Sequence, residues 1–90
     1  MTDTVTTINP ANEQTLNTYN LLSLQQAQSE VDQCHQAFLK WRTTSHEQRA
    51  KLLNQLAQVI ESNQQELAQL MTDEMGKLYQ QGLQEVELCA

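Results

Sequence analysis

The amino-acid sequence predicts a short amino-terminal β-hairpin followed by about four α-helices, the last of which is truncated. Two observations support this prediction. Residues 1–22 are rich in Thr and Asn and contain the only proline, Pro10, without a helical repeat of apolar residues. From Leu24 onward, apolar residues recur at intervals of three and four, which places them on one face of a helix. The 90 residues suffice for one small domain.

Residues 1–22 are expected to be extended. The β-branched residues at 5–8 favour a strand, and residues 9–12, which include Pro10, favour a turn. A second extended piece spans residues 16–22, with weak alternation of apolar and polar residues. The two pieces either pair as a hairpin or remain two short extended segments.

Residues 23–90 are expected to be helical, and a first helix is predicted from residue 23 to about residue 42. Ser23 and Gln26 form a capping box, in which each side chain bonds to the backbone N–H of the other residue. The apolar stripe behind this cap consists of Leu24, Ala27, Val31, Cys34, Phe38 and Trp41.

The same capping signal recurs at Ser45 and Gln48, which predicts a second helix to about residue 61. Its apolar face consists of Leu52, Leu53, Leu56, Val59 and Ile60. Asn63 and Glu66 can cap a third helix, and Gly76 supplies its left-handed stop. The apolar residues of this third helix are Leu67, Leu70, Met71 and Met75.

A fourth helix is predicted from the stripe Tyr79, Leu83, Val86 and Ala90. Glu85 and Glu87 lie in its last turn, where the helix dipole disfavours negative charge, and no terminating Gly or Asn follows. We therefore expect this helix to be truncated at Ala90 rather than to end there with its own C-cap. Because the connections between the helices are short, we expect antiparallel packing, with Trp41 and Leu53 buried between the first two helices.

Composition excludes several classes of function. Five Lys and Arg residues against eleven Asp and Glu residues give a net charge of −6, so binding to nucleic acid is not expected. No apolar run approaches the ~20 residues of a membrane span. The first residues lack the basic and apolar regions of a signal peptide, so a cytoplasmic location is expected. Cys34 and Cys89 fit no zinc-binding spacing and are most simply buried small hydrophobes.

Several residue types that could perform chemistry have a simpler structural interpretation. Cys34 and His35 resemble a nucleophile and its base, but adjacent helical residues do not face each other, and Cys34 lies on the apolar stripe. Cys89 lies among acidic residues, which oppose formation of the reactive thiolate. Four acidic residues could form an acid/base pair or a metal site but are typical of a solvated helix face: Asp73, Glu74, Glu85 and Glu87.

The remaining candidates are equally unspecific. His46 lies in the first turn of a helix, where an exposed role is commonest, and Met71 and Met75 have the spacing of a core. Gly76 and Lys77 lack the glycine-rich lead and the following Ser or Thr of a phosphate loop. The sequence therefore predicts no catalytic, cofactor-binding or metal-binding residue in this chain.

An ordered set of short motifs covers nearly the whole chain. These motifs are "INPAN" at residues 8–12, Phe38-Leu-Lys-Trp41-Arg42, Ser45-x-x-x-Arg49, Leu53-x-x-Leu56-Ala57, Glu66-Leu67, Glu74-Met-Gly76-Lys77 and Glu85-Val86. Each motif alone is weak, but in this order and at this spacing they resemble the amino-terminal end of the aldehyde dehydrogenase superfamily. The succinate-semialdehyde dehydrogenase branch is the most similar.

The resemblance implies an α/β parent with a Rossmann-type cofactor domain, in which residues 1–90 form a hairpin and several helices at the edge of that domain. The catalytic domain would be absent from this segment. The nucleophilic cysteine, the general-base glutamate and the residues that hold NAD or NADP would all lie after Ala90, so Cys89 is not the nucleophile. The implied parent, a homo-oligomer, transfers hydride from a thiohemiacetal to nicotinamide and then hydrolyses the thioester. The other partner of this segment would be the remainder of its own chain.

The sequence also departs from the family pattern. Asn12-Glu13-Gln14 lacks the usual glycine, which makes a tight turn with positive φ harder to form. Leu78 stands where a proline is common, and Gly82 weakens the fourth helix by roughly 1 kcal/mol relative to alanine. Arg49, by contrast, belongs to a motif that carries the resemblance. It lies in the first turn of the second helix, where the helix dipole disfavours a positive charge, so a carboxylate partner elsewhere is expected.

Two hypotheses from different classes remain open on the residues alone. The chain is either the amino-terminal segment of an NAD(P)-dependent aldehyde dehydrogenase or a stand-alone acidic helical module that binds other proteins.

Overall fold

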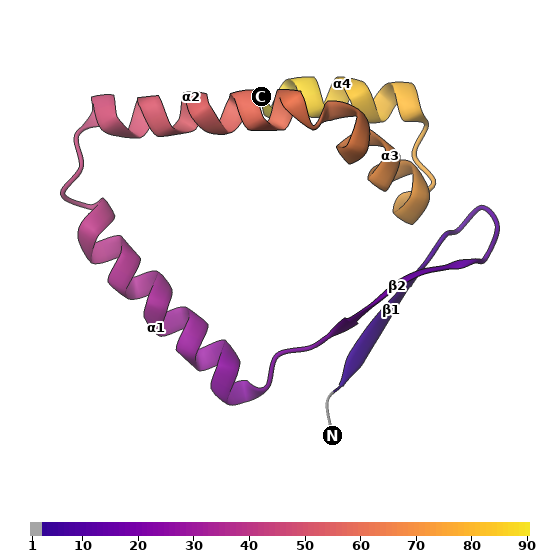
Figure 1. The fold of residues 1–90 in the computed structure, drawn as a ribbon, viewed down its shortest axis with the longest axis horizontal. Helices are drawn as coiled ribbons and strands as arrows, with labels where there is room; N and C mark the ends of the chain where they lie inside the picture. Colours follow the sequence, from indigo (N-terminus) through magenta and orange to yellow (C-terminus); the bar gives the residue numbers. More distant parts are fainter. Residues whose placement is uncertain (1–2) are drawn as a thin grey trace.

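The computed structural model describes residues 3–90 as two strands followed by four helices (Figure 1). The elements are β1 (Thr4–Ile8), β2 (Thr15–Asn20), α1 (Leu24–Trp41), α2 (His46–Ser62), α3 (Gln64–Met75) and α4 (Tyr79–Cys89). The predicted order of a hairpin followed by helices is confirmed.

The two strands form an antiparallel hairpin rather than separate extended segments. Val5 lies opposite Tyr19 and Thr6 opposite Thr18, with the two threonine hydroxyls 3.0 Å apart. The register shifts between Thr7 and Ile8, next to the turn. Glu13 takes a φ of 62° in that turn, so a glutamate occupies the left-handed conformation that glycine adopts most easily.

Both predicted capping boxes are confirmed. The N–H of Gln26 donates to Ser23 Oγ (3.1 Å), and the N–H of Ser23 donates to Gln26 Oε1 (2.8 Å). Ser45 and Gln48 repeat the pair at 3.2 and 3.0 Å. Gly76 has a φ of 70° and ends α3, as predicted.

The predicted cap of α3 by Asn63 is wrong. The Asn63 side chain makes no capping hydrogen bond to α3, and its Nδ2 instead donates to the carbonyl of Val59 in α2 (2.7 Å). Because α2 ends one residue before Asn63 and α3 begins one residue after it, the side chain can serve only one helix end. Asn63 satisfies the last carbonyls of α2, which otherwise lack partners.

Arg49 closes the corner between α1 and α2. Its Nη2 donates to the carbonyl of Trp41 (3.0 Å), its Nε donates to Thr44 Oγ1 (2.9 Å), and its guanidinium carbon lies 5.3 Å from the centre of the Trp41 ring. These contacts provide a cation and hydrogen bonds at the negative end of α1. The carboxylate partner expected for Arg49 is therefore replaced by backbone, a hydroxyl and an aromatic ring.

The prediction that α1 and α2 pack as antiparallel neighbours is wrong for this chain. The extensive contacts are those of α3 with α4 and of β1 with β2, and α2 touches α4 more lightly, whereas α1 diverges from α2 at the corner (Figure 1). Trp41 is 39% exposed and Leu53 61% exposed, so neither is buried between the helices. In the connection, the hydroxyls of Thr43 and Thr44 donate to the last carbonyls of α1.

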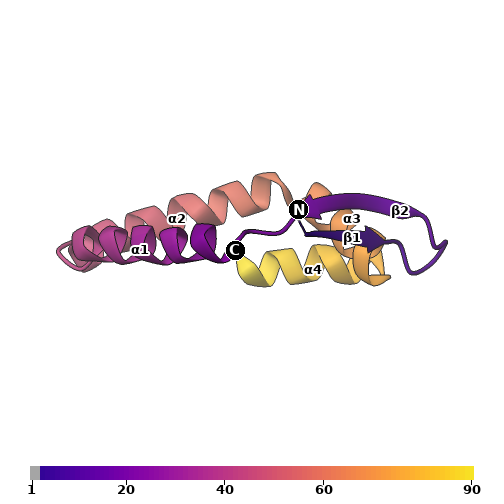
Figure 2. The same ribbon diagram turned by 90° about the horizontal axis from the view of Figure 1, so that it is seen from below.

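The resulting body is flat and open. Its extents are 48 × 40 × 14 Å and its radius of gyration is 17.6 Å, whereas a compact domain of this length has a radius of about 12 Å. Figure 2 shows the thin profile, with helices α3 and α4 lying at one end beside the hairpin. Among residues 3–90, the buried hydrophobic residues are only Ala68 and Val86. The structure therefore has a small core, confined to the place where α3 meets α4.

Candidate functional site

The α3–α4 contact is the best packed part of the molecule. Ala68 is fully buried and Val86 is 2% exposed, and Gly82 is buried against Ala68. A Cβ atom on Gly82 would lie 3.2 Å from both the Cα and the Cβ of Ala68. Gln64 adds a hydrogen bond from its Nε2 to the carbonyl of Leu83 (3.1 Å). This seam is apolar and filled, so it holds two helices together and leaves no space for a substrate.

The cysteines do not form a nucleophilic site. Both Cys34 and Cys89 are free and exposed, so the expectation that they are buried hydrophobes is wrong for this chain. Cys34 is exposed because no other element covers the stripe of α1 on which it lies. The neighbouring His35 ring lies against Phe38, with 6.2 Å between ring centres. Among the described residues, no hydrogen bond pairs Cys34 with His35, so the arrangement of a nucleophile and its base is not formed.

The acidic residues of α3 and α4 engage separate partners. Asp73 accepts a hydrogen bond from Gln69 Nε2 (2.8 Å), and Glu85 forms an ion pair with Lys77. Glu87 accepts a longer bond from Gln64 Nε2 (3.5 Å). Within residues 3–90, no three side chains of His, Cys, Asp or Glu are grouped so that they could hold a metal ion. These acids belong to the helix surface.

The remaining sequence candidates are dispersed over the surface. His46 is exposed at the first position of α2. Met75 is 79% exposed, so its prediction as a core residue is wrong, whereas Met71 is half-buried. The two methionines, with Lys77 and Glu85, line a surface depression of about 510 Å³. Sequence analysis missed the Lys77–Glu85 pair, because residues eight apart and separated by a helix start have no fixed spatial relation.

The residues of this segment do not fit a bound dinucleotide. A pyrophosphate is held by backbone N–H groups at a glycine-rich turn from a strand into a helix. The connection from β2 to α1 contains Leu21, Leu22 and Ser23, and Ser23 already accepts the N–H of Gln26. Neither glycine lies at such a turn, because Gly76 ends α3 and Gly82 packs on Ala68.

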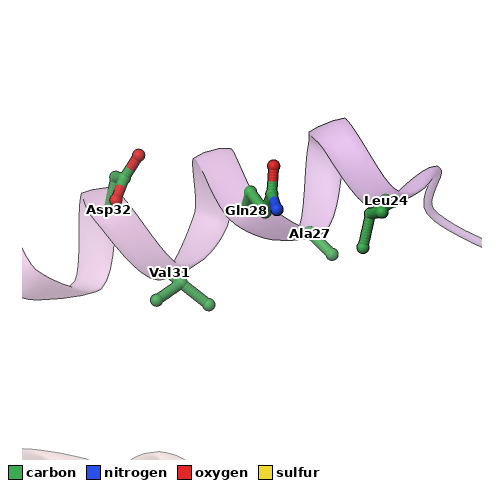
Figure 3. Close-up of a pocket in the computed structure, with 5 residues that line it drawn as sticks. All are labelled: Leu24, Ala27, Gln28, Val31 and Asp32. Atoms are coloured by element: carbon green, nitrogen blue, oxygen red, sulfur yellow. The ribbon is translucent and has the colours of Figure 1, made fainter.

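A second depression, of about 550 Å³, lies along α1 (Figure 3). Leu24, Ala27 and Val31 point to one side of the helix, and Gln28 and Asp32 point to the other (Figure 3). Leu24 is 77% and Val31 68% exposed. All five residues belong to a single helix, whereas a small-molecule site has walls that enclose the ligand and polar groups that converge on it. The depression is therefore an uncovered apolar helix face.

No helix among residues 3–90 combines the length and the hydrophobicity needed to cross a membrane.

Comparison with known proteins gives a consistent result over the whole chain. Residues 1–90 match the family model described as "Aldehyde dehydrogenase family". A protein of Synechocystis sp. named "Probable succinate-semialdehyde dehydrogenase (NADP+)" is 36% identical over 86 residues, which is 96% of this chain and 19% of the relative. The succinate-semialdehyde dehydrogenase (NADP+) of Mycobacterium leprae is 34% identical over 86 residues, with the same coverage.

A third relative carries a different substrate in its name. The 3,6-anhydro-alpha-L-galactose dehydrogenase of a Vibrio species is 35% identical over 83 residues, which is 92% of this chain and 17% of that protein. The chain therefore spans about a fifth of the length of the curated relatives it matches.

Proposed function

This chain belongs to the aldehyde dehydrogenase family, and from this premise we propose that residues 1–90 are the amino-terminal part of the cofactor-binding domain of an NAD(P)-dependent enzyme that oxidises an aldehyde to a carboxylic acid. One observation supports this most directly. The match extends over 96% of the chain but over only 19% of the Mycobacterium leprae relative. We therefore propose that the segment is one part, the amino-terminal one, of a much larger enzyme.

The proposed parent oxidises succinate semialdehyde with NADP. Two of the relatives described above carry this substrate and this cofactor in their names. The Vibrio relative, which is equally similar, is named for a sugar aldehyde. Because relatives named for different aldehydes are equally similar to this segment, the residues that select the aldehyde are proposed to lie in the rest of the parent.

The segment itself is proposed to be structural, with no catalytic, cofactor-binding or metal-binding residue. Its strand-to-helix connection lacks glycine, and neither exposed cysteine is joined to a base among the described residues. NAD or NADP would be bound by the remainder of the parent. The cytoplasmic location and the homo-oligomeric assembly of the parent stay predictions.

The alternative function, a stand-alone acidic helical module, is less well supported. An independent module of this size needs a core of its own. In the described chain, only Ala68 and Val86 are buried hydrophobic residues, and α1 lacks an extensive contact with any other element. The open packing therefore favours a segment that belongs to a larger protein.

A chimaera tests the proposed function. Residues 1–90 replace the matched region of the Mycobacterium leprae relative, and turnover of succinate semialdehyde with NADP is followed by nicotinamide absorbance. We expect the chimaera to be active and the 90-residue chain alone to be inactive. The relative without its matched region serves as the control for the contribution of the segment.

Two outcomes contradict the proposal. One is a folded chimaera that oxidises no aldehyde while the unmodified relative does. The other is turnover by the 90-residue chain alone, or its saturable binding of NAD or NADP in a calorimeter, since either would place a complete site within this segment.

A further inference from the structure

Helices α1 and α2 each expose a continuous apolar stripe, and we call these two surfaces the α1–α2 stripes. Their large side chains are between 39% and 77% exposed. Monomeric proteins rarely leave apolar patches of more than a few hundred Å² in contact with water. The stripes consist of Leu24, Val31, Phe38 and Trp41 on α1 and of Leu52, Leu53, Leu56 and Val59 on α2.

The stripes lie on helices that lack a second layer. Stable domains pack at least two layers of secondary structure around a shared core. In residues 3–90, the extensive helix–helix contact is that of α3 with α4, and α1 has no comparable contact. The body is only 14 Å thick along its shortest axis, and Figure 2 shows it from the side. Within residues 3–90, no element supplies α1 with this second layer.

The corner between the stripes is basic, although the chain is acidic. Residues 40–51 contain four of the five basic residues of the chain and only one of its eleven acidic residues. Arg49 is engaged with Trp41 and Thr44. Lys40, Arg42 and Lys51 are exposed, and none takes part in an ion pair within residues 3–90. A complementary partner would present carboxylates opposite this corner.

We propose that the remainder of the parent chain covers the α1–α2 stripes, with an apolar surface that is bordered by carboxylates at the basic corner. This proposal rests on the proposed function. Two observations point to the remainder of the parent chain as the surface that covers the stripes. About four-fifths of the relatives' length lies outside the matched region, and α4 brings Ala90 back beside α2 (Figure 1). A second copy of this chain is a poorer occupant because two chains of net charge −6 repel each other.

The native Cys34 can report whether the α1–α2 stripes are covered in the larger protein. It lies on the α1 stripe and is exposed in the 90-residue chain. Gln36 is exposed, does not line the depression along α1, and lies two residues after Cys34, about 200° around the helix, so Gln36→Cys in a Cys34→Ala background is a matched control on the opposite side. Labelling by a maleimide is measured for each position by mass spectrometry of the peptide, in the 90-residue chain and in the chimaera with the Mycobacterium leprae relative.

We expect Cys34 to be labelled at least about tenfold more slowly in the chimaera than in the 90-residue chain, and the cysteine at position 36 to be labelled at similar rates in both. Lys51→Glu in the chimaera should speed labelling of Cys34 by about threefold, whereas Gln65→Glu, the control introduction of an acid on α3, should not. Equal labelling of Cys34 in both proteins would overturn the proposal. An unchanged rate in Lys51→Glu would overturn the part that concerns carboxylates.

The remaining outcomes separate this proposal from the proposed function. An active chimaera with a freely labelled Cys34 overturns the proposed docking but not the proposed function. An inactive chimaera with a protected Cys34 contradicts the proposed function but not the docking. Protection that grows with the concentration of the 90-residue chain alone identifies a second copy as the occupant, against the proposal. If the chimaera does not fold, a graft of residues 24–62 alone is labelled in the same way. Failure of both grafts, while the unmodified relative folds, also contradicts the docking.

Discussion

Gly82 of α4 lies directly against Ala68 of α3. A Cβ atom on Gly82 would come within 3.2 Å of the Cα and Cβ of Ala68 and within 3.3 Å of its carbonyl oxygen. Most real contacts of a Cβ atom are longer, and the nearest atoms include backbone, which cannot turn away. The glycine therefore allows the two helices to approach closely enough to bury Ala68 and Val86.

We expect Gly82→Ala to destabilise the α3–α4 pair by about 1 kcal/mol. Overpacking a filled contact costs about 1–3 kcal/mol, and the better helix propensity of alanine offsets about 1 kcal/mol of this. Unfolding in urea, followed by circular dichroism, measures the change. The double variant Gly82→Ala with Ala68→Gly should recover part of the loss, because it removes the opposing Cβ. A stabilised Gly82→Ala variant would show that the seam has room.

Glu13→Gly should stabilise the hairpin by about 0.5–1 kcal/mol. The left-handed conformation costs a residue with a side chain about 1–2 kcal/mol, and glycine removes this cost. Glycine also makes the unfolded chain more flexible, which offsets part of the stabilisation. Amide exchange of β1 and β2 should slow accordingly. Gln14→Gly is the control, because Glu13 is the only non-glycine residue with positive φ among the described residues. Faster exchange in Glu13→Gly would contradict the assignment of strain to Glu13.

Arg49→Lys should loosen the corner between α1 and α2 although it keeps the positive charge. The lysine ammonium lacks the planar fork that lets Arg49 donate to both the Trp41 carbonyl and Thr44 Oγ1 from above the indole ring, so we expect a loss of about 1 kcal/mol in stability. Trp41 is the only tryptophan, so its fluorescence reports this change directly. Lys51→Arg is the matched control. Unchanged emission and unchanged exchange of the last turn of α1 in Arg49→Lys would refute the role of the guanidinium.

The loss of stability caused by Leu53→Ala should be small in the 90-residue chain and large in the chimaera, and Val86→Ala serves as the reference for a buried residue. In the 90-residue chain, Leu53 is 61% exposed and Val86 is 2% exposed. We expect Leu53→Ala to cost less than about 0.5 kcal/mol there, and Val86→Ala about 1–3 kcal/mol. In the chimaera, where the stripes are covered, Leu53→Ala should cost about 2–5 kcal/mol. Urea unfolding of the four proteins measures the contrast, and a small cost of Leu53→Ala in both settings argues against the cover.

Local features of this fold were predictable from the sequence because their causes are local. The capping boxes at Ser23 and Ser45 need only residues three apart, and the stop at Gly76 needs only the absence of a side chain. Asn63 was misassigned because the end of one helix and the start of the next compete for one side chain. The type and order of the elements follow from such short-range signals.

The packing of α1 and α2 was not predictable in the same way. An apolar stripe shows that one face of a helix is buried in the finished protein, but it does not identify what covers that face. The stripes therefore predict a contact between Leu53 and Trp41, whereas both are exposed in this chain. From the sequence, Gly82 only weakens α4. Its role in close packing depends on Ala68, which lies on another helix and cannot be identified from the sequence. The sequence shows no pattern of catalytic or phosphate-binding residues, and the expectation that this segment carries no site residue stays a prediction.

The division between a packed end and an open end has a consequence for biosynthesis. The strands β1 and β2 are near neighbours in sequence, as are α3 and α4, so both contacts can form while the chain is still leaving the ribosome. The α1–α2 stripes have no such early partner. If, as proposed, this segment is the amino-terminal part of a longer enzyme made as one chain, these helices wait through the synthesis of the remaining four-fifths or so, at ~5–20 residues per second. During that interval, the exposed leucines of α1 and α2 are the part of the nascent enzyme that a chaperone would hold.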